Sequence, residues 1–360
     1  MTDALLFRPT WMSAPGDTIA ELLDEREWSQ ADLALRTGFT KKHVNELVRG
    51  RASITANAAE RLSAVLGSTA EFWITREAKY QAAQERLRTL ESRKTDTGWL
   101  SELPVQWMIK QGLILPDTNR AARVDACLRY FGVANVDAWR ETYTAPLAAF
   151  RSSAGLSRRL GTLATWLRVV ELEAARVECL PFELATFREV LSSARGLTAQ
   201  RDPQRFLHEL RELCAAAGVA VVWSPAPPGC AVHGVTRWLS STKALLALSA
   251  RYRTDDQLWF SFFHEAGHIV KHGKKLLFIE GVDGLDADKE AEADRYAAST
   301  LIPSEHNTEL AALRTELAIK RFAASLSLTP GIVVGRLQHD GMLSHAQMNH
   351  LKVRYEWATP

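Results

Sequence analysis

Two histidines and a glutamate in the stretch 262–270 have the residue types and the spacing needed for metal-assisted hydrolysis. His264 and His268 are four residues apart, so on a helix they share one face and can bind the same ion. Glu265 lies on the adjacent face, where its carboxylate could hold a metal-bound water and accept its proton. The pattern His-Glu-x-x-His therefore predicts a Zn²⁺ site with two imidazole ligands, a general base and an open coordination position, which is the arrangement for peptide-bond hydrolysis.

A third ligand is expected from the segment 289–298, whose alanines predict a second helix. Glu290 and Asp294 are four residues apart and share a face of that helix. We expect Glu290 to bind zinc and Asp294 to accept the free N–H of a zinc-bound histidine. Glu292 is about 200° around the helix from Glu290 and is expected to be a nearby acid outside the ligand set. The alternative is an alanine-rich surface helix with solvated acids.

His272 offers another imidazole, two turns after His264. Eight residues of helix rise about 12 Å, which is too far for both rings to reach one Zn²⁺ through bonds of about 2 Å. We therefore expect His272 to act as a charge partner for the negative end of the helix.

A small sheet should precede the site helix. Runs rich in β-branched and apolar residues predict strands at 218–223, 230–238 and 244–249. A peptide could pair with an exposed edge of this sheet. His233 and Arg237, on the second strand, are candidate residues of the substrate cleft, although a histidine on a strand more often has a structural role.

Residues 219–303 resemble the ImmA/IrrE family of metallopeptidases. The resemblance rests on three motifs, which are His264-Glu265-Ala266-Gly267-His268, Glu290-Ala291-Glu292-Ala293-Asp294-Arg295-Tyr296-Ala297 and Leu301-Ile302-Pro303. Tyr296 stands where phenylalanine is usual in the family. The resemblance implies zinc-dependent cleavage of a regulatory protein.

The N-terminal part shows a second pattern, after a polar arm at residues 1–17. Ser29 can cap a helix at 30–36, and Thr40 can cap a helix at 41–49. Gly38 separates these two short helices. Two capped helices joined by a glycine turn predict helix-turn-helix geometry.

Basic and polar residues of this segment are suited to DNA. The second of the two helices would enter the major groove, with some residues reading bases and others binding phosphate. The candidate base readers are Thr40, Lys41, Lys42, His43 and Asn45, and the candidate phosphate ligands are Gln30, Arg49 and Arg51. The alternative is a small helical bundle with a solvated basic face.

Residues 18–80 resemble the XRE-type (lambda-repressor-like) helix-turn-helix. The pattern runs from Ser29-Gln30 through Leu33-Ala34, Gly38, Thr40, Val44-Asn45 and Leu47 to Arg49-Gly50. Its continuation through Ile54-Thr55, Arg61-Leu62, Leu66-Gly67 and Glu71-Phe72-Trp73-Ile74 is more narrowly similar to HigA-type antitoxin repressors.

Composition sets limits on the whole chain. Its 360 residues suggest two or three domains, and a net charge of +2 means that any nucleic-acid surface must be local. Four scattered cysteines without a Cys-x-x-Cys pair favour reduced thiols in a cytoplasmic protein. We expect neither a signal peptide nor a membrane partner, because the sequence lacks an apolar run of the required length.

These patterns predict a mainly α (α+β) protein with three domains. They are a helix-turn-helix bundle with arm and linker helix at 1–95, a helical middle domain at 96–217, and a zincin-like domain with a small β-sheet at 218–360. We expect a homodimeric regulator that binds double-stranded promoter or operator DNA. Its zinc endopeptidase would cleave a partner, such as a toxin or repressor, or the chain itself. The alternatives are a HigA-like antitoxin or repressor whose peptidase-like domain only senses or scaffolds, and a peptidase whose helical head binds protein.

Overall fold

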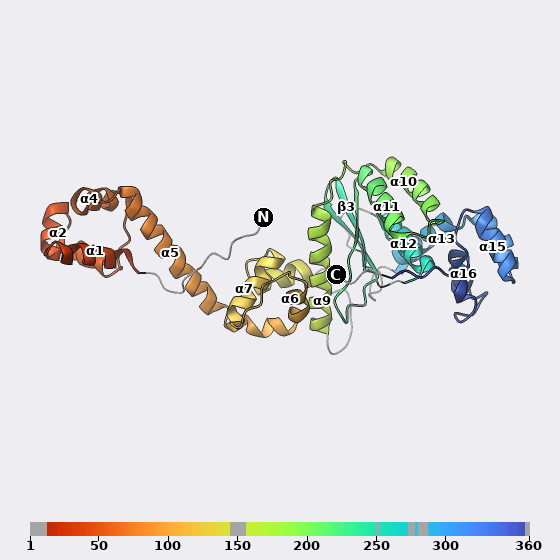
Figure 1. Cartoon of the computed structure of the whole chain (residues 1–360), viewed down its shortest axis with the longest axis horizontal. Coiled ribbons are helices and arrows are strands. Elements are labelled where there is room, and N and C mark those ends of the chain that lie inside the picture. Colours follow the sequence, from red (N-terminus) through yellow and green to blue (C-terminus); the bar gives the residue numbers. More distant parts are fainter. Residues whose placement is uncertain are drawn as a thin grey trace. The chain divides into compact units, whose positions relative to one another are not determined.

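The computed structural model describes residues 13–144, 156–249, 251, 253–272, 278–279 and 287–356 of the chain. By their contacts the residues divide into two units. Unit 1 is formed by Met1–Thr97 with Asp117–Asp125, and unit 2 by Gly98–Pro116 with Ala126–Pro360. Helices predominate in both units, and a small sheet lies in unit 2 (Figure 1).

Unit 1 is a helical bundle around one apolar core. Its main helices are α1 (Pro15–Glu25), α2 (Gln30–Thr37), α3 (Lys41–Val48), α4 (Ala56–Leu66) and α5 (Ala70–Ser92). Each helix contributes a fully buried side chain to the core, namely Ile19, Leu33, Val44, Leu62 and Trp73. Burial of these five side chains stabilises the bundle by about 1.5–3 kcal/mol each.

Local signals set the ends of α2 and α3. Ser29 and Asp32 form a reciprocal capping box at the start of α2, and Thr40 accepts the backbone N–H of His43 at the start of α3. Gly38 ends α2 with φ of 69°, a conformation that glycine adopts at little cost. The predicted helix starts at residues 30 and 41 are therefore confirmed.

The first helix begins earlier than predicted. It starts at Pro15 rather than at residue 18, because proline is well suited to the first position of a helix, where no N–H is needed. The predicted arm is thus shorter than 1–17, and its residues 1–12 lie outside the described part of the chain.

The sheet of unit 2 has the strand order β1-β3-β2-β4. The strands are β1 (Val219–Trp223), β2 (Gly234–Ser240), β3 (Lys243–Leu248) and β4 (Phe278–Ile279). β1 and β3 are parallel, whereas β2 is antiparallel to both β3 and β4. β2 starts four residues later than predicted, because Cys230 is held in a turn by a hydrogen bond from its N–H to the carbonyl of Pro227.

Helices cover both faces of the sheet. α9 (Leu156–Ala175) packs on one face, and α10 (Leu184–Leu197), α11 (Pro203–Ala216) and α12 (Asp255–Lys271) pack on the other (Figure 1). Side chains alternate between the faces along each strand. On β2, Val235 therefore joins the core under α9, whereas Trp238 packs into the core shared with α12.

The remaining elements of unit 2 lie before α9 and after α12 in the sequence. Before α9 lie α6 (Val105–Lys110), α8 (Val136–Trp139) and a π-helical turn at Arg140–Thr144, and α7 (Arg120–Phe131) runs across the boundary between the units. After α12 follow α13 (Ala287–Leu301), α14 (Asn307–Ala312), α15 (Glu316–Ser325) and α16 (Pro330–His339). α13 packs along α12, and α16 packs against α12 and α15.

The predicted boundary at 217/218 differs from the structure. Phe187 of α10 and Phe206 of α11 are fully buried in the same core as Leu246 of β3 and Phe262 of α12. Trp166 of α9 is buried against the other face of the sheet. The helices of residues 156–217 therefore belong to the same unit as the sheet, because they supply the apolar cover that a small sheet requires.

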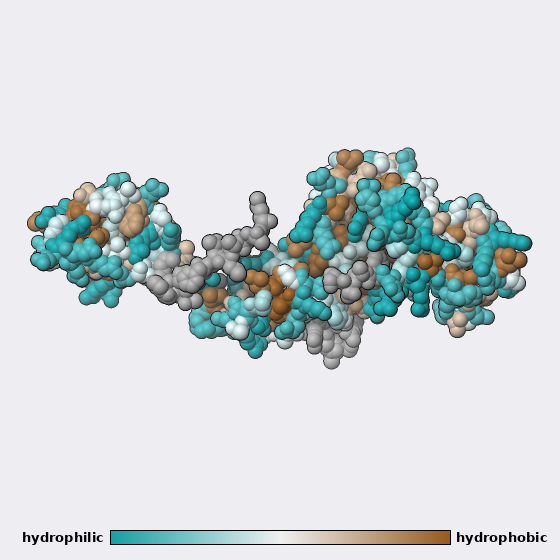
Figure 2. Space-filling view, in the orientation of Figure 1, coloured by the Kyte–Doolittle hydropathy of each residue, from teal (hydrophilic) through white to brown (hydrophobic). Residues whose placement is uncertain are grey.

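The surface is polar apart from scattered apolar side chains. On the face shown in Figure 2, hydrophilic residues predominate and hydrophobic ones are interspersed among them. Within the described residues, no single helix has the length and apolar character needed to cross a membrane. Among the helices that the structure describes, α15 and α16 taken together reach that length and composition, but they are bent by 112° at their junction.

Candidate functional sites

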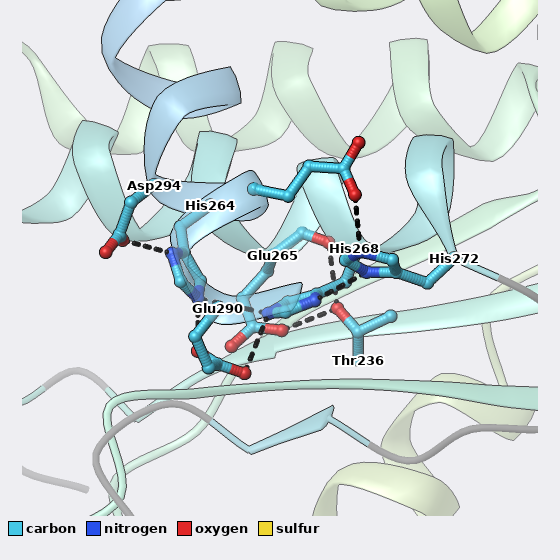
Figure 3. Close-up of polar contacts among 8 residues, drawn as sticks. Thr236, His264, Glu265, His268, His272, Glu290 and Asp294 are labelled. Atoms are coloured by element: carbon cyan, nitrogen blue, oxygen red, sulfur yellow. Dashed lines mark hydrogen bonds and ion pairs between the residues drawn. The ribbon is translucent and has the colours of Figure 1, made fainter. Parts of the chain in front are cut away.

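Three side chains from two helices converge at one point in unit 2. His264 and His268 project from α12, and Glu290 projects from α13 (Figure 3). Nε2 of His264 lies 3.1 Å from Nε2 of His268 and 3.2 Å from Oε2 of Glu290. Nε2 of His268 lies 3.4 Å from Oε1 of Glu290. These residues can offer a metal ion two imidazole nitrogens and a carboxylate.

Small residues allow α13 to approach α12 closely enough to deliver Glu290. A Cβ atom added to Gly267 would lie 3.3 Å from Cα of Ala293 and 3.2 Å from the ring of Tyr296. A larger residue at position 267 would therefore push the two helices apart. A glycine inside a helical pattern is visible in the sequence and can indicate a close helix contact. Its role at position 267 depends on which helix packs against it, and the sequence does not show that.

Asp294 orients the first histidine. Its Oδ1 lies 2.8 Å from Nδ1 of His264, the ring nitrogen that faces away from the three-residue cluster. A carboxylate at this position favours a proton on Nδ1 and a lone pair on Nε2. The structure thus places Asp294 where the sequence predicts a brace for a ligand histidine.

Glu292 and His272 lie together at the other end of the cluster. Nε2 of His272 is 3.4 Å from Oε2 of Glu292, and Nδ1 of His272 is 3.0 Å from Nδ1 of His268. We expected His272 to act as a charge partner at the helix end, and the structure shows a further contact, with the ring of His268. His272 lies outside the ligand triad but contacts the rear of a ligand ring, and it is only 4% exposed.

The charges of the cluster are balanced by hydrogen bonds. Burial alone would raise the pKa of Glu290, but its contacts with the ring nitrogens of His264 and His268 outweigh burial and, without a metal, hold the pKa at about 2. Burial lowers the pKa of His268, against the opposing hydrogen bond from Glu290. An ionised glutamate beside neutral imidazole is the protonation state that a divalent metal requires of these ligands.

Glu265 is held under the sheet by two residues of β2. It is fully buried, and Thr236 donates a hydrogen bond of 2.6 Å to its Oε2. A Cβ atom on Gly234 would lie only 2.6 Å from Oε1 of Glu265. Sequence reasoning missed both residues. The alternation of a strand shows from the sequence that positions 234 and 236 share one face. The sequence does not show that this face packs against α12.

Arg237 and His233, the two residues predicted for a substrate cleft, lie in different surroundings. Arg237 forms an ion pair with Glu171 of α9, on the sheet face opposite to Thr236 and Glu265. Its assignment to the cleft is therefore wrong, because neighbouring residues of a strand point to opposite faces. His233 immediately precedes β2 and is half-buried, and burial together with Arg251 lowers its pKa.

The edge of β2 and the surroundings of Asp294 define the space around the site. β4 pairs with β2 at Val235 and Thr236, so the edge on which a peptide was expected to pair is already occupied at these positions. On the Asp294 side, a cavity of about 440 Å³ opens between α12, α13 and α16. Its walls include the apolar residues Phe260, Ala298, Leu301 and Ile332.

In unit 1, α3 presents the residues expected to contact DNA. Lys41, Arg49 and Arg51 are exposed, and no ion pair joins them to any residue that the structure describes. Lys42 lies 4.0 Å from Glu46 with 86% of its side chain exposed, a pair that costs little to separate. These cations are available to an external anion.

The polar candidates of this surface contact one another. Asn45 donates a hydrogen bond of 3.1 Å to Oε1 of Gln30, which links α3 to the start of α2. His43 packs edge-on against Phe39, with ring centroids 4.9 Å apart. Thr40 is exposed, but its hydroxyl already caps α3. The structure thus gathers the predicted readers on one helix and its flanks.

Comparisons with known proteins define the class of unit 1. A family model described as Helix-turn-helix matches residues 19–73. The uncharacterized HTH-type transcriptional regulator YddM of Escherichia coli (strain K12) is 31% identical over 70 residues, which cover 19% of this chain and 74% of that protein. The chain belongs to the helix-turn-helix family of DNA-binding transcriptional regulators. No solved structure matches it.

Proposed function

We propose that this regulator carries a zinc-dependent endopeptidase in unit 2, which cleaves a regulatory protein partner or the chain itself. The observation that supports it most strongly is the convergence of His264, His268 and Glu290, with Glu265 buried beside them. The ImmA/IrrE-like motifs of residues 219–303 and the zincin-like order of sheet, site helix and ligand helix point to the same activity.

The spacing of the candidate ligand groups is close to that of a zinc site. Bonds of about 2.0–2.1 Å in a tetrahedral site place neighbouring ligand atoms about 3.3–3.4 Å apart. Nε2 of His264 lies 3.1 Å from Nε2 of His268 and 3.2 Å from Oε2 of Glu290, and Nε2 of His268 lies 3.4 Å from the other carboxylate oxygen, Oε1. Three protein ligands leave a fourth position for water or substrate, as catalytic zinc sites require.

In this proposal each residue has a defined task. A zinc ion held by His264, His268 and Glu290 would supply Lewis-acid activation of a water molecule and of the peptide carbonyl. Glu265 accepts the proton of that water and transfers it to the leaving amine. Thr236 fixes one oxygen of Glu265 during this transfer. The cavity beside Asp294 gives room for a side chain of the bound peptide.

Substitution of the general base tests the peptidase. Glu265→Gln should retain zinc but lose cleavage of the partner or of the chain itself, because the amide cannot accept the proton. Glu305→Gln, at a side chain that is 79% exposed, is the matched control and should cleave normally. Zinc content is measured by elemental analysis, and cleavage by mass spectrometry of the products.

Two outcomes would change this view. Cleavage that survives Glu265→Gln would remove the peptidase proposal. A wild-type protein that binds zinc but leaves its partner and itself intact would favour the HigA-like alternative, in which unit 2 senses or scaffolds.

For unit 1 we propose that α3 enters the major groove of an operator, with a second copy of the chain on the other half-site. Lys41, Lys42, His43 and Asn45 would face the bases, and Gln30 would hold Asn45 in place. Arg49 and Arg51, exposed beyond α3, would bind phosphates. The proposal rests on the exposed cations of this one surface. The chain as a whole has a net charge of only +2, so its overall charge does not favour DNA binding.

A gel-shift titration on the DNA upstream of the protein's own gene tests this assignment. Lys41→Ala should weaken binding, and each phosphate contact that is lost should lower the slope of log affinity against log salt by about one. Lys79→Ala, at an exposed position of α5, is the control. Normal binding by a triple variant with alanine at Lys41, Lys42 and Asn45 would exclude α3 as the reading helix.

A further inference from the structure

A chain of side-chain contacts runs behind His268, on the side of the ring that faces away from the triad. Nδ1 of His268 lies 3.0 Å from Nδ1 of His272 (Figure 3). Nε2 of His272 lies 3.4 Å from Oε2 of Glu292. The first distance is that of a hydrogen bond, and the second is that of a longer electrostatic contact. Lys271 adds a further contact to Glu292, at 3.7 Å.

The positions of the ring protons follow from this chain. If Nε2 of His268 offers its lone pair to a metal, its proton must be on Nδ1. That proton is then donated to Nδ1 of His272, which must be unprotonated. The proton of a neutral His272 therefore lies on Nε2, and this nitrogen faces the carboxylate of Glu292. Each ring has one tautomer that agrees with metal binding by His268.

We propose that His272 is a positioning residue, which together with Glu292 holds His268 in the orientation and tautomer that bind the metal. His272 is suited to this task because it is 4% exposed and packed between α12 and α13. Its own backbone N–H bonds to the carbonyl of His268, which fixes the ring relative to the ligand. The inference rests on the proposed zinc site, but it concerns two residues outside the ligand triad.

The arrangement gives each ligand histidine its own carboxylate from α13. Asp294 contacts His264 directly, whereas Glu292 reaches His268 through His272. Glu292 and Asp294 are two residues apart and therefore leave α13 in nearly opposite directions. His272 spans the additional distance on the His268 side. The expected role of Glu292 as an isolated nearby acid thus becomes a defined one.

Zinc affinity, measured by competition with a chromophoric chelator, tests the proposal without reference to catalysis. His272→Leu should lower the affinity about 10–100-fold, the usual effect of losing a group that orients a ligand. His272→Gln should restore most of it, because the amide oxygen can accept the proton of His268 and the amide N–H can reach Glu292. His208→Leu removes an exposed histidine that pairs with Glu212 on α11, and it should have no effect.

A second variant covers the case in which His272→Leu does not fold. Glu292→Ala changes a side chain that is 42% exposed, so the fold should be preserved while zinc affinity still falls. Absorption spectra with Co²⁺ in place of zinc should show altered coordination in His272→Leu and wild-type coordination in His272→Gln.

Several results would overturn the inference. It fails if folded His272→Leu binds zinc as tightly as the wild type, since the polar contacts of His272 would then be unnecessary. It also fails if His272→Gln binds zinc as weakly as His272→Leu, since restoring the hydrogen-bonding groups would then have no effect. A wild-type protein that binds no zinc removes both this inference and the proposed peptidase. If the zinc affinities of the variants follow the expected order but the wild-type protein cleaves nothing, the inference stands and only the peptidase is rejected.

Discussion

At the candidate metal site, the role expected of each of three acidic residues depends on the helix face that it occupies. Glu290 and Asp294 are one turn apart on α13, and both reach His264, at 3.2 and 2.8 Å. Glu292 points elsewhere and contacts Lys271 and His272. The period of the helix therefore assigns a ligand and a brace to one face and a more distant support to the other.

Alanine substitutions at these acids should follow that order. Glu290→Ala should lower zinc affinity far more than Glu292→Ala, because it removes a ligand rather than a support. Asp294→Ala should cost about 10–100-fold in affinity or activity, since His264 loses the partner that sets its tautomer. Zinc titrations of the three variants give the order directly, and a stronger effect of Glu292→Ala than of Glu290→Ala would refute the ligand assignment.

Among the elements, β2 is the part of unit 2 that positions Glu265, the proposed general base. Thr236 bonds to both the carboxylate and the backbone carbonyl of Glu265, at 2.6 and 3.0 Å. Gly234 lets the strand pass close to the same carboxylate. The strand thus connects the sheet to Glu265 of α12 at two positions.

Gly234→Ala should displace Glu265 without removing the metal. The new methyl group would lie 2.6 Å from Oε1, so the flexible glutamate must move. If unit 2 is a peptidase, we expect cleavage to fall about 10-fold or more, since a positioned base contributes at least that factor. Zinc affinity should stay near that of the wild type. Gly196→Ala, where an added Cβ meets nothing within 4 Å, is the control. Unchanged cleavage in Gly234→Ala would show that the close contact between residue 234 and Glu265 is unimportant for activity.

The start of α12 is anchored by a buried carboxylate. Asp255 is fully buried and accepts hydrogen bonds from the hydroxyl of Thr329 and from the backbone N–H of Val353. Burial raises its pKa from the ordinary value of 3.8 to about 6, against the Thr329 hydrogen bond, which lowers it. The folded state therefore binds this proton more tightly than the unfolded state.

A defined pH dependence of stability follows from this shift. The contribution of Asp255 to the free energy of unfolding should rise as the pH falls through 6, by roughly 1 kcal/mol between pH 7 and pH 5, and should be lost again as the pH rises. Asp255→Asn should lack this contribution. Urea unfolding of both proteins at pH 5, 6 and 7 measures the difference, and equal pH slopes would contradict the assigned pKa.

At the scale of the whole molecule, the two units carry two different kinds of candidate site. Unit 1 belongs to a family that binds DNA, and its exposed cations gather around α3. Unit 2 holds a buried cluster of histidines and acids inside a core shared by helices and a sheet.

Dimerisation should accompany DNA binding. One helix-turn-helix reads only a few base pairs, and two half-sites about 34 Å apart are needed for a specific operator. Light scattering of the protein with its operator should give two chains per DNA site, with a fragment of scrambled sequence as the control. A single chain on the operator at saturating protein would reject this expectation.

Local sequence determined the parts that depend on short range. Capping by Ser29 and Thr40, the glycine turn at Gly38 and the four-residue spacing of His264 and His268 each act within one or two helical turns. Their structural consequences could therefore be predicted without knowing how the chain packs.

Tertiary structure decided everything that depends on which faces meet. The helices α9 to α11 pack on the sheet, so the second half of the predicted middle domain belongs with the sheet. The sequence could not show this, because an apolar stripe on a helix does not specify its partner. The opposite faces of β2 sent Arg237 away from the site and brought Thr236 to Glu265. The approach of α13 at Gly267 placed Glu292 beside His272. These contacts join residues 20 or more positions apart in the sequence, and only the folded core brings them together.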